Sequence, residues 1–284
     1  MQDGILVIDK PRGMTSADVV ARVKRALRAR RCGHTGTLDP MATGVLPIAL
    51  DEGTKAAAFL LRDDKTYEGE LELGVTTDTL DAEGAVTGRA DPGDVSAETL
   101  RAAFAAWVGD REQIPPMYSA LKHGGKRLYE LARAGVEVDR PARRIRIDRL
   151  ELQWFRPPHA RFVVDCQKGT YVRALVRDIG AAVGCGATLT SLRRTRAGRF
   201  TLADAVTLHR AAEGRVIPLA EVLADLPAVT VVPECRADVQ HGRPIPAPQA
   251  APAGPLRILG PDGALLAVGE ADAGKIRYLR VFLG

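Results

Sequence analysis

One aspartate, Asp39, stands in an apolar loop near the N-terminus, with no second acid after it until Asp51. Residues 33–47 hold three glycines, which permit unusual backbone angles, and two prolines, which fix theirs, so neither a helix nor an interior strand is expected here. Apolar neighbours should press the loop into a core with its acid at the rim. Since a half-buried carboxylate needs a partner, Asp39 is a candidate for chemistry. The alternative is a surface loop whose acid caps a turn.

The elements that must position this acid follow from the spacing of apolar residues. Helices are expected after a cap at Thr15 or Ser16 and over 54–61, 96–108, 128–134, 171–183 (capped by Gly169-Thr170), 202–212 and 217–224. Strands are expected over 4–9, 65–75, from 86 onward, and over 144–154, 161–166, 188–200, 229–232, 256–259, 264–270 and 276–282. Tyr67 falls on the inner face of its strand, whereas Arg173 lies near the start of its helix and off the apolar face.

The composition is that of an ordinary globular protein. Of its 284 residues, 46% are hydrophobic and 26% charged. No apolar run approaches the ~18 residues that span a bilayer, and the cytoplasm is the expected compartment. The four cysteines show no C-x-x-C spacing and the five histidines no i, i+4 pairing, so neither disulfides nor a metal site is expected.

Basic residues are gathered in runs. Residues 22–31, which include Arg22 and Arg25, hold six basic side chains and no acid; residues 193–199, which begin with Arg193, hold four and no acid. With a net charge of +5, such runs are typical of nucleic-acid binding, although a solvated helix face looks similar.

Two further segments differ from the rest. Residues 113–149 carry nine basic side chains, among them Lys122, Lys126 and Arg127, against four acids, and they are irregular, so they suit a protruding arm that closes over an RNA or else a tolerated surface insertion. Beyond residue 226 the composition shifts towards Pro, Gly and Val, which predicts a small separate β-rich domain with a proline-rich loop over 244–255.

The run GHTGTLDPMATGVLPI, with Lys65-Thr66-Tyr67 and KGTYVR at 168–173, closely resembles the TruB-type tRNA pseudouridine synthases of bacteria. The resemblance covers residues 4–225. It implies an α+β fold, in which residues 1–226 form a catalytic domain with a central mixed, mostly antiparallel sheet flanked by helices. Residues 113–149 would be a thumb that enters the tRNA elbow, and residues 227–284 a PUA-like RNA-binding domain.

The family resemblance also implies the activity, which is isomerisation of uridine 55 to pseudouridine in the T-loop of tRNA. Asp39 would be catalytic and paired with Arg173, while Tyr67 would stack on the flipped-out base and relay the C5 proton. Tyr171 and Leu192 would line the pocket, and His34 would fill the place left by the extruded nucleotide. The remaining RNA contacts would be Lys55, alternatively a partner of Asp81, together with Arg22, Arg25, Lys122, Lys126, Arg127 and Arg193.

Isomerisation conserves every atom of the substrate, so no cofactor or metal is expected, and phosphate-binding motifs such as G-x-x-x-x-G-K-[ST] are absent from the sequence. The expected partner is the tRNA T-arm. No membrane and no obligatory protein partner are expected, and the chain should be a monomer.

The residues leave three alternative functions open. A non-enzymatic RNA-binding or tRNA-folding protein would use the same basic runs. A synthase directed to ribosomal RNA, or an RNA-guided one of the dyskerin group, would share the aspartate. A hydrolase or phosphotransferase with a carboxylate nucleophile would need a second acid or a metal close by, and Leu38-Asp39-Pro40 supplies neither. The route by which Asp39 acts, whether attack at C1′, addition at C6 or removal of the 2′ proton, is also open.

Overall fold

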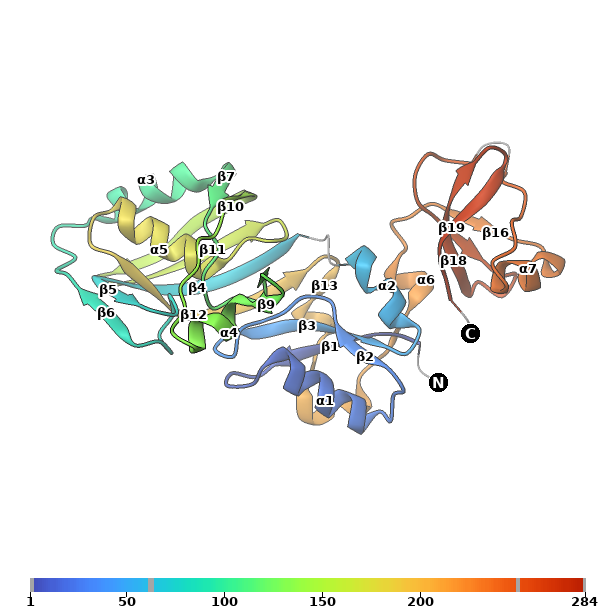
Figure 1. The fold of residues 1–284 in the computed structure, drawn as a ribbon, viewed down its shortest axis with the longest axis horizontal. Coiled ribbons are helices and arrows are strands. Elements are labelled where there is room, and N and C mark those ends of the chain that lie inside the picture. The colour runs from blue at the N-terminus through green and yellow to red at the C-terminus, as the bar shows by residue number, and fades with distance from the viewer. Residues whose placement is uncertain (1–2, 61–63, 249–250, 283–284) are drawn as a thin grey trace.

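The computed structural model describes residues 3–60, 64–248 and 251–282, and it shows a larger and a smaller body (Figure 1). Within these residues the larger body is built on an eleven-stranded sheet and the smaller one on a four-stranded sheet. The predicted helix end at residue 61 and part of the predicted loop 244–255 lie outside the described residues.

The main sheet runs in the order β14-β1-β3-β12-β4-β11-β10-β7, with β2, β13 and β15 paired beside this path. Its neighbours are antiparallel except β1 with β14 and β3 with β12, which confirms a mixed, mostly antiparallel sheet. The bounds of its strands are β1 (Gly4–Lys10), β2 (Cys32–His34), β3 (Thr43–Leu50), β4 (Lys65–Leu73), β7 (Gly109–Gln113), β10 (Arg143–Arg156), β11 (His159–Cys166), β12 (Ala187–Ala197), β13 (Phe200–Thr201), β14 (Val206–Thr207) and β15 (Ile217–Pro218).

The apolar run after Asp39 forms β3, which lies inside the sheet between β1 and β12. Every residue of β3 after Thr43 is buried. The expectation that residues 33–47 contain no interior strand was therefore wrong for 43–47, because a strand covered on both faces reads as a continuous apolar run. Pro47 lacks an N–H donor, but its carbonyl still accepts a hydrogen bond from the Thr35 N–H at 3.1 Å.

Strand β12 joins two halves of the sheet. It pairs with β4 over nearly its whole length, from Ala187 opposite Leu73 to Ala197 opposite Lys65. With β3 it pairs in parallel through Arg193 opposite Thr43 and Arg194 opposite Gly44. We call this short junction between β3 and β12 the seam.

Helices cover both faces of the sheet. On one face, α1 (Ser16–Ala26), α3 (Ala97–Trp107) and α5 (Val172–Ala182) share a core with β3, β4 and β11. On the other face lie α2 (Gly53–Leu60) and α6 (Leu219–Val222), in a second cluster. The predicted Thr15 cap of α1 is confirmed, with the Asp18 N–H donating to its hydroxyl at 3.1 Å. Gly169-Thr170 does not cap α5, whose N-cap residue is Tyr171.

Two pairs of short strands lie outside the main sheet. Strands β5 (Val75–Thr77) and β6 (Val86–Arg89) pair as predicted for a return strand. Strands β8 (Lys122–His123) and β9 (Lys126–Arg127) form a hairpin that leads into α4 (Leu128–Arg133).

The predicted helices over 202–212 and 217–224 were wrong. The structure has short 3₁₀ turns η1 (Leu202–Asp204) and η2 (Leu208–Glu213), the strands β14 and β15, and the single helical turn α6. Both strands pair with the free edge of β1, β14 in parallel and β15 antiparallel. Satisfying that edge outweighs the local helical pattern.

The smaller body has the strand order β16-β17-β18-β19. Its elements are β16 (Ala228–Thr230), η3 (Pro233–Cys235), α7 (Arg236–Gln240), β17 (Leu256–Leu259), β18 (Leu265–Asp272) and β19 (Lys275–Val281). The four strands agree with the predicted ones within two residues. Val268 and Phe282 pack into the cluster that holds Ile5 and Val7 of β1. The domain boundary between residues 226 and 227 stays a prediction.

Replacing Gly44 by alanine should destabilise the protein strongly. Gly44 has φ +99°, and a Cβ there would lie 2.1 Å from the carbonyl oxygen of Arg194 across the seam. We expect Gly44→Ala to lower the free energy of unfolding by about 3 kcal/mol or more, measured by denaturant titration. Gly93→Ala is the matched control, because Gly93 also has a positive φ (+55°) but no atom within 4 Å of the added Cβ; it should cost about 1 kcal/mol. Equal losses would show that the close approach at the seam is unimportant.

Candidate active site

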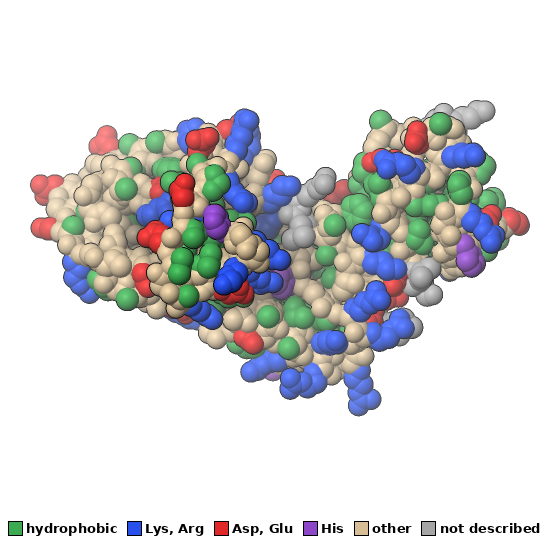
Figure 2. Space-filling model, viewed as in Figure 1, with side chains coloured by type: hydrophobic (Ala, Val, Ile, Leu, Met, Phe, Trp, Pro, Cys, Tyr) green, Lys and Arg blue, Asp and Glu red, His purple; other side chains and the backbone are tan. Residues whose placement is uncertain are grey.

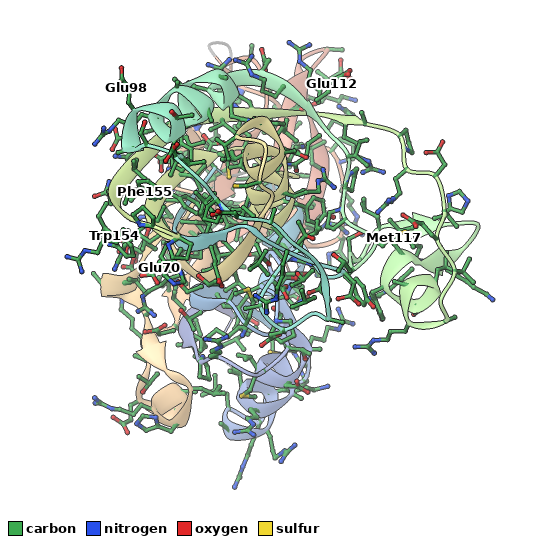
Figure 3. The ribbon with its side chains drawn as sticks, turned by 90° about the vertical axis from the view of Figure 1, so that its left-hand side faces the viewer. Glu70, Glu98, Glu112, Met117, Trp154 and Phe155 are labelled. Atoms are coloured by element: carbon green, nitrogen blue, oxygen red, sulfur yellow. The ribbon has the colours of Figure 1, made fainter. Side chains whose placement is uncertain are left out.

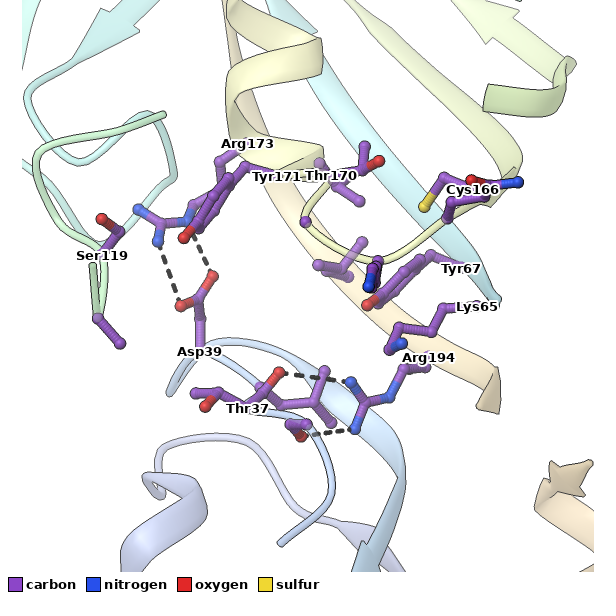
Figure 4. A pocket seen from close by; sticks show the side chains of 18 residues that line it. Thr37, Asp39, Lys65, Tyr67, Ser119, Cys166, Thr170, Tyr171, Arg173 and Arg194 are labelled. Carbon is purple, nitrogen blue, oxygen red and sulfur yellow. Dashed lines mark hydrogen bonds and ion pairs between the residues drawn. The ribbon is translucent and has the colours of Figure 1, made fainter. Parts of the chain in front are cut away.

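A cavity of about 270 Å³ lies beside the seam, the start of α5 and the loop that carries Asp39 (Figure 4). Residues from distant parts of the chain line it together. Those relevant to the chemistry are Asp39, Tyr67, Tyr171, Arg173, Leu192 and Arg194.

Asp39 and Arg173 form a two-point ion pair in this cavity. The Arg173 guanidinium donates from Nε to Asp39 Oδ2 at 2.8 Å and from Nη2 to Oδ1 at 3.2 Å. The arginine side chain is 4% exposed and the aspartate 35%, so the carboxylate stays accessible while its partner does not. Such parallel hydrogen bonds fix the direction of a carboxylate as well as its charge. This geometry agrees with the pairing predicted from the resemblance.

The other donors of Arg173 are also used. Its Nη1 donates to the Thr79 carbonyl at 2.6 Å and its Nη2 to the Tyr118 carbonyl at 2.8 Å. Arg173 was expected off the apolar face of its helix, yet it is buried, because these partners replace the water that a guanidinium would lose.

A second carboxylate lies close to the pair. Asp81 is 4% exposed, and its Oδ2 lies 3.6 Å from the Nε of Arg173. From sequence, Asp39 had no neighbouring acid, but the turn after β5 brings Asp81 to the same arginine. The alternative that Lys55 is the partner of Asp81 was wrong, because Lys55 pairs with Glu52 at 2.6 Å and donates to the Val281 carbonyl.

Two buried side chains hold the loop around Asp39 in shape. The ammonium of Lys10, at the end of β1, donates to the carbonyls of Pro11 (2.9 Å), Pro40 (3.2 Å) and Ala42 (2.7 Å). The hydroxyl of Ser16, at the start of α1, donates to the Leu38 carbonyl at 3.0 Å and accepts from the Leu38 N–H at 2.8 Å. Burial lowers the pKa of Lys10 from its ordinary 10.5 to about 8.

Two tyrosines line the cavity, Tyr67 from β4 and Tyr171 from the start of α5. Tyr67 on β4 is 7% exposed, and burial raises the pKa of its phenol, while the positive charge of Arg194 opposes that rise. Burial likewise raises the pKa of Tyr171. The backbone of Tyr171 is held by Gln113, whose side chain accepts from the Tyr171 N–H at 2.9 Å and donates to its carbonyl at 3.2 Å. Both phenols are therefore neutral at neutral pH.

Among the remaining predicted residues, Leu192 lines the cavity, as expected. His34 lies on β2, outside the cavity wall; its Nδ1 is buried without a hydrogen-bond partner in the described part of the chain, and burial lowers its pKa. Arg193 is turned away to Asp9, with a contact of 2.8 Å. Arg22 and Arg25 are exposed on α1, and their roles in RNA binding stay predictions.

Strand β7 reaches Gln113 and β10 begins at Arg143, so the segment between them is residues 114–142; an RNA-binding arm over 113–149 stays a prediction. Residues 114–142, which we call the thumb, extend from the body beside Met117 (Figure 3). Basic side chains gather over the thumb and over α1 on the face in Figure 2. The β8–β9 hairpin of the thumb exposes the side chains of Lys122, Lys126 and Arg127. Ser119, which also belongs to the thumb, lines the cavity.

Three functional side chains were missed from sequence. The predicted strand 4–9 stopped short of Lys10, and Asp81 was considered only as a partner of Lys55. Arg194 was counted in a basic run, yet it is 1% exposed. A signal for Arg194 was its place two residues after Leu192 in a predicted strand, which puts both on one face, but no local feature distinguishes a buried arginine from an exposed one.

In the described ranges, no group of three or more His, Cys, Asp or Glu side chains is arranged to hold a metal ion. No helix among the described residues is long and apolar enough to cross a membrane.

Comparison with known families gives three matches along the chain. Residues 24–172 match the model of the TruB family pseudouridylate synthase N-terminal domain. Residues 173–217 match the tRNA pseudouridylate synthase B C-terminal domain, and residues 227–282 match the pseudouridine synthase II TruB C-terminal model.

Curated relatives match over nearly the full length. The chain is 48% identical over 277 residues to the tRNA pseudouridine synthase B of Aromatoleum aromaticum, which covers 95% of this chain and 89% of that protein. It is 45% identical over 290 residues to the enzyme of that name from Pseudomonas aeruginosa strain UCBPP-PA14, covering 98% and 95%.

Solved structures have a similar fold. A chain from a crystal structure of a Cbf5-Nop10-Gar1 complex superposes with a TM-score of 0.75 at 27% identity, covering 99% of this chain and 85% of that one. A chain from an H/ACA RNP bound to a substrate RNA containing 2′-deoxyuridine gives a TM-score of 0.74 at 25% identity, covering 100% and 86%.

The burial of Lys10 should make stability depend on pH. Its pKa in the folded protein, about 8, lies below the ordinary 10.5 of the unfolded chain. Between these values the unfolded chain binds the proton that the folded protein has released, so the contribution of Lys10 to the free energy of unfolding rises with pH across this window and is constant below it. We expect the free energy of unfolding of wild type minus that of Lys10→Met, both measured by urea titration, to increase from neutral pH to pH 10. A difference that stays constant would contradict the lowered pKa.

Proposed function

The chain belongs to the TruB family of pseudouridylate synthases, and we propose that it isomerises uridine 55 in the T-loop of tRNA, with Asp39 as the catalytic carboxylate. The observation that carries this proposal is the two-point pair of Asp39 and Arg173 at the cavity that Tyr67 and Leu192 also line. The names of the relatives, tRNA pseudouridine synthase B, support tRNA as the substrate.

The reaction needs a flipped-out nucleotide in a partly desolvated cavity. It breaks the N1–C1′ bond, turns the base and joins C5 to C1′; the proton leaves C5 and another is gained at N1. Asp39, held in one direction by Arg173, would face the sugar with its carboxylate. Its attack at C1′, its addition at C6 and its removal of the 2′ proton all begin from this orientation.

The aromatic residues would hold the base. Tyr67 offers a buried ring for stacking and a neutral phenol that can pass on the C5 proton. Tyr171 and Leu192 close the cavity from α5 and β12. His34, neutral because its pKa is lowered, is suited to stack in the place that the extruded base leaves. Unstacking costs a few kcal/mol, which ring stacking of this kind offsets.

The cations around the cavity would hold the T-arm. The exposed residues of the thumb, Lys122, Lys126 and Arg127, and those of α1, Arg22 and Arg25, would contact phosphates. The C-terminal body would add RNA contacts as a PUA-like domain. Arg193 and Lys55 are engaged by Asp9 and Glu52, so their part in binding is smaller than the sequence predicts.

Rival functions differ in what the purified chain can do alone. A guided synthase requires partner proteins and a guide RNA, whereas the proposed enzyme modifies an isolated T-arm hairpin. A tRNA-folding protein without chemistry binds the T-arm but leaves its uridine unchanged. We therefore expect the purified chain, without cofactors, to form pseudouridine in unmodified tRNA, mapped by chemical probing of the product. Pseudouridine at another position, or only in ribosomal RNA, would overturn the assignment to the T-loop.

Asp39→Asn should separate binding from catalysis. The amide keeps the shape but loses the charge, so we expect tRNA affinity within a few-fold of wild type and a loss of pseudouridine formation by at least ~10³-fold in single-turnover assays. Asp94→Asn is the matched control, since Asp94 is exposed on the turn before α3. Product at near wild-type rate from Asp39→Asn would remove the catalytic assignment.

Neutralising the thumb should weaken binding without changing specificity. We expect the triple variant Lys122→Gln, Lys126→Gln, Arg127→Gln to bind the T-arm more weakly and to reduce the slope of log affinity against log salt by about 2 to 3, because each phosphate contact contributes about one. A control that removes the same charge elsewhere, from Arg89, Arg101 and Arg210, should leave the slope near wild type. Equal slopes in both variants would exclude the thumb from phosphate contact.

A further inference from the structure

Arg194 occupies the junction on which the cavity is built. On β12 it is register partner to Gly44 of β3 on one side and to Tyr67 of β4 on the other. The strand that follows the Asp39 loop and the strand that carries Tyr67 therefore both pair with β12 at Arg194 and its neighbour Arg193. Its side chain is 1% exposed and lines the cavity.

The guanidinium of Arg194 holds the loop on the far side of the seam. Nε donates to the Val45 carbonyl at 2.7 Å, Nη2 to the Gly36 carbonyl at 3.1 Å and Nη1 to the Thr37 carbonyl at 3.3 Å. Gly36 and Thr37 come directly before Leu38 and Asp39, and Val45 follows on β3. All three acceptors thus belong to the segment that carries the carboxylate.

Tyr67 and Arg194 both line the cavity and lie on the same side of it in Figure 4, with Lys65 drawn between them. Their strands are directly paired at these residues, so their Cβ atoms lie on the same face of the sheet. The positive charge of Arg194 is the first influence that opposes the burial of this phenol. One side chain is therefore in position to act on both halves of the cavity.

We infer that Arg194 is a positioning residue that fixes Asp39 and Tyr67 relative to each other across the seam, and that it acts in the chemical step and not in tRNA binding. The inference rests on the proposed function. It departs from the interpretation of residues 193–199 as a phosphate-binding run, because a side chain whose donors already bind three carbonyls has little capacity for a phosphate.

The physical basis is the shortness of the seam. Strands β3 and β12 pair through two residues on each strand, so backbone hydrogen bonds alone leave the two halves of the sheet weakly registered there. A displacement of about 1 Å between reacting groups costs on the order of 10²-fold in rate. Arg173 orients the carboxylate from α5 through bonds to Asp39, Thr79 and Tyr118, none of which lies on β3 or β4. Arg194, in contrast, lies on β12 and bonds directly to Val45 of β3, so it is the side chain placed to hold the register of the two strands.

The test compares Arg194→Gln and Arg194→Lys with Tyr67→Phe and with the double variant Arg194→Gln, Tyr67→Phe. Single-turnover rates at saturating tRNA and the dissociation constant for tRNA are measured for each. Arg161→Gln is the matched control, since Arg161 pairs with Glu68 and Glu70 of the same strand, β4, outside the cavity. Thermal melting establishes that each variant is folded.

We expect Arg194→Gln to lower the single-turnover rate by about 10²-fold, with the tRNA dissociation constant within about 3-fold of wild type. Arg194→Lys, which keeps the charge but not the fork, should recover part of the rate. If Arg194 acts with Tyr67, the double variant should be no slower than the slower single variant by more than about 3-fold. If Arg194→Gln does not fold, Arg194→Lys takes its place. Its single-turnover rate and its dissociation constant for tRNA are then compared with those of wild type and Tyr67→Phe by the same criteria.

Two results would overturn the inference: a rate for Arg194→Gln within a few-fold of wild type, or losses in the double variant that multiply as for independent residues. Weakened tRNA binding with an unchanged rate would instead assign Arg194 to phosphate contact. Failure of the proposed function is separate, because it would appear as the absence of pseudouridine with the wild-type chain itself.

Discussion

The burial of one guanidinium governs the arrangement of the site. Arg173 is almost wholly removed from water, and a buried cation is tolerated only where its donors are satisfied. Its four hydrogen bonds reach the carboxylate of Asp39 and the carbonyls of Thr79 and Tyr118, which lie on three segments far apart in the chain. The Asp39 loop, the turn after β5 and the base of the thumb are thereby held at one point. The cost of burying the charge makes this arrangement specific.

The site is assembled from two halves of a sheet that scarcely pair with each other. The half with β1 and β3 brings Asp39, whose loop is fixed by Lys10 and Ser16. The half with β4, β11 and β12 brings the aromatic wall and, through α5, Arg173. The cavity lies between these two halves, which share one hydrophobic cluster. The same construction makes the site sensitive to any change of register at the seam.

The arginines fall into two groups that differ in physical role. Arg173 and Arg194 are buried, with donors directed to carboxylate or carbonyl oxygens, and they act on the geometry of the site. The exposed cations of the thumb and of α1 face water, where their contribution to folding is small and their attraction for phosphates is long-ranged. Charge counts along the chain do not distinguish these groups, since the run over 193–199 holds both the buried Arg194 and the exposed Arg199.

Helices and strands could be predicted from the chain alone where the residues that mark them are close together in sequence. The helix capped by Thr15, the alternating strand with Tyr67 on its inner face and the strands of the C-terminal body follow from capping and periodicity. The motif around Asp39, through its resemblance to a family, indicated both the acid and its partner Arg173. The elements need only neighbouring residues to be predicted, whereas the pairing of Asp39 with Arg173 came from the resemblance alone.

Features that depend on contacts between distant residues could be recognised only in the folded chain. Pro47 lies in an interior strand because both faces of β3 are covered. The short strands Val206–Thr207 and Ile217–Pro218 pair with the edge of β1 where local spacing predicts helices. Asp81 joins the Asp39–Arg173 pair, and Arg194 turns inward, because partners far along the chain satisfy them. A polar side chain is buried or exposed according to whether folding brings it a partner, and no local pattern encodes where that partner will be.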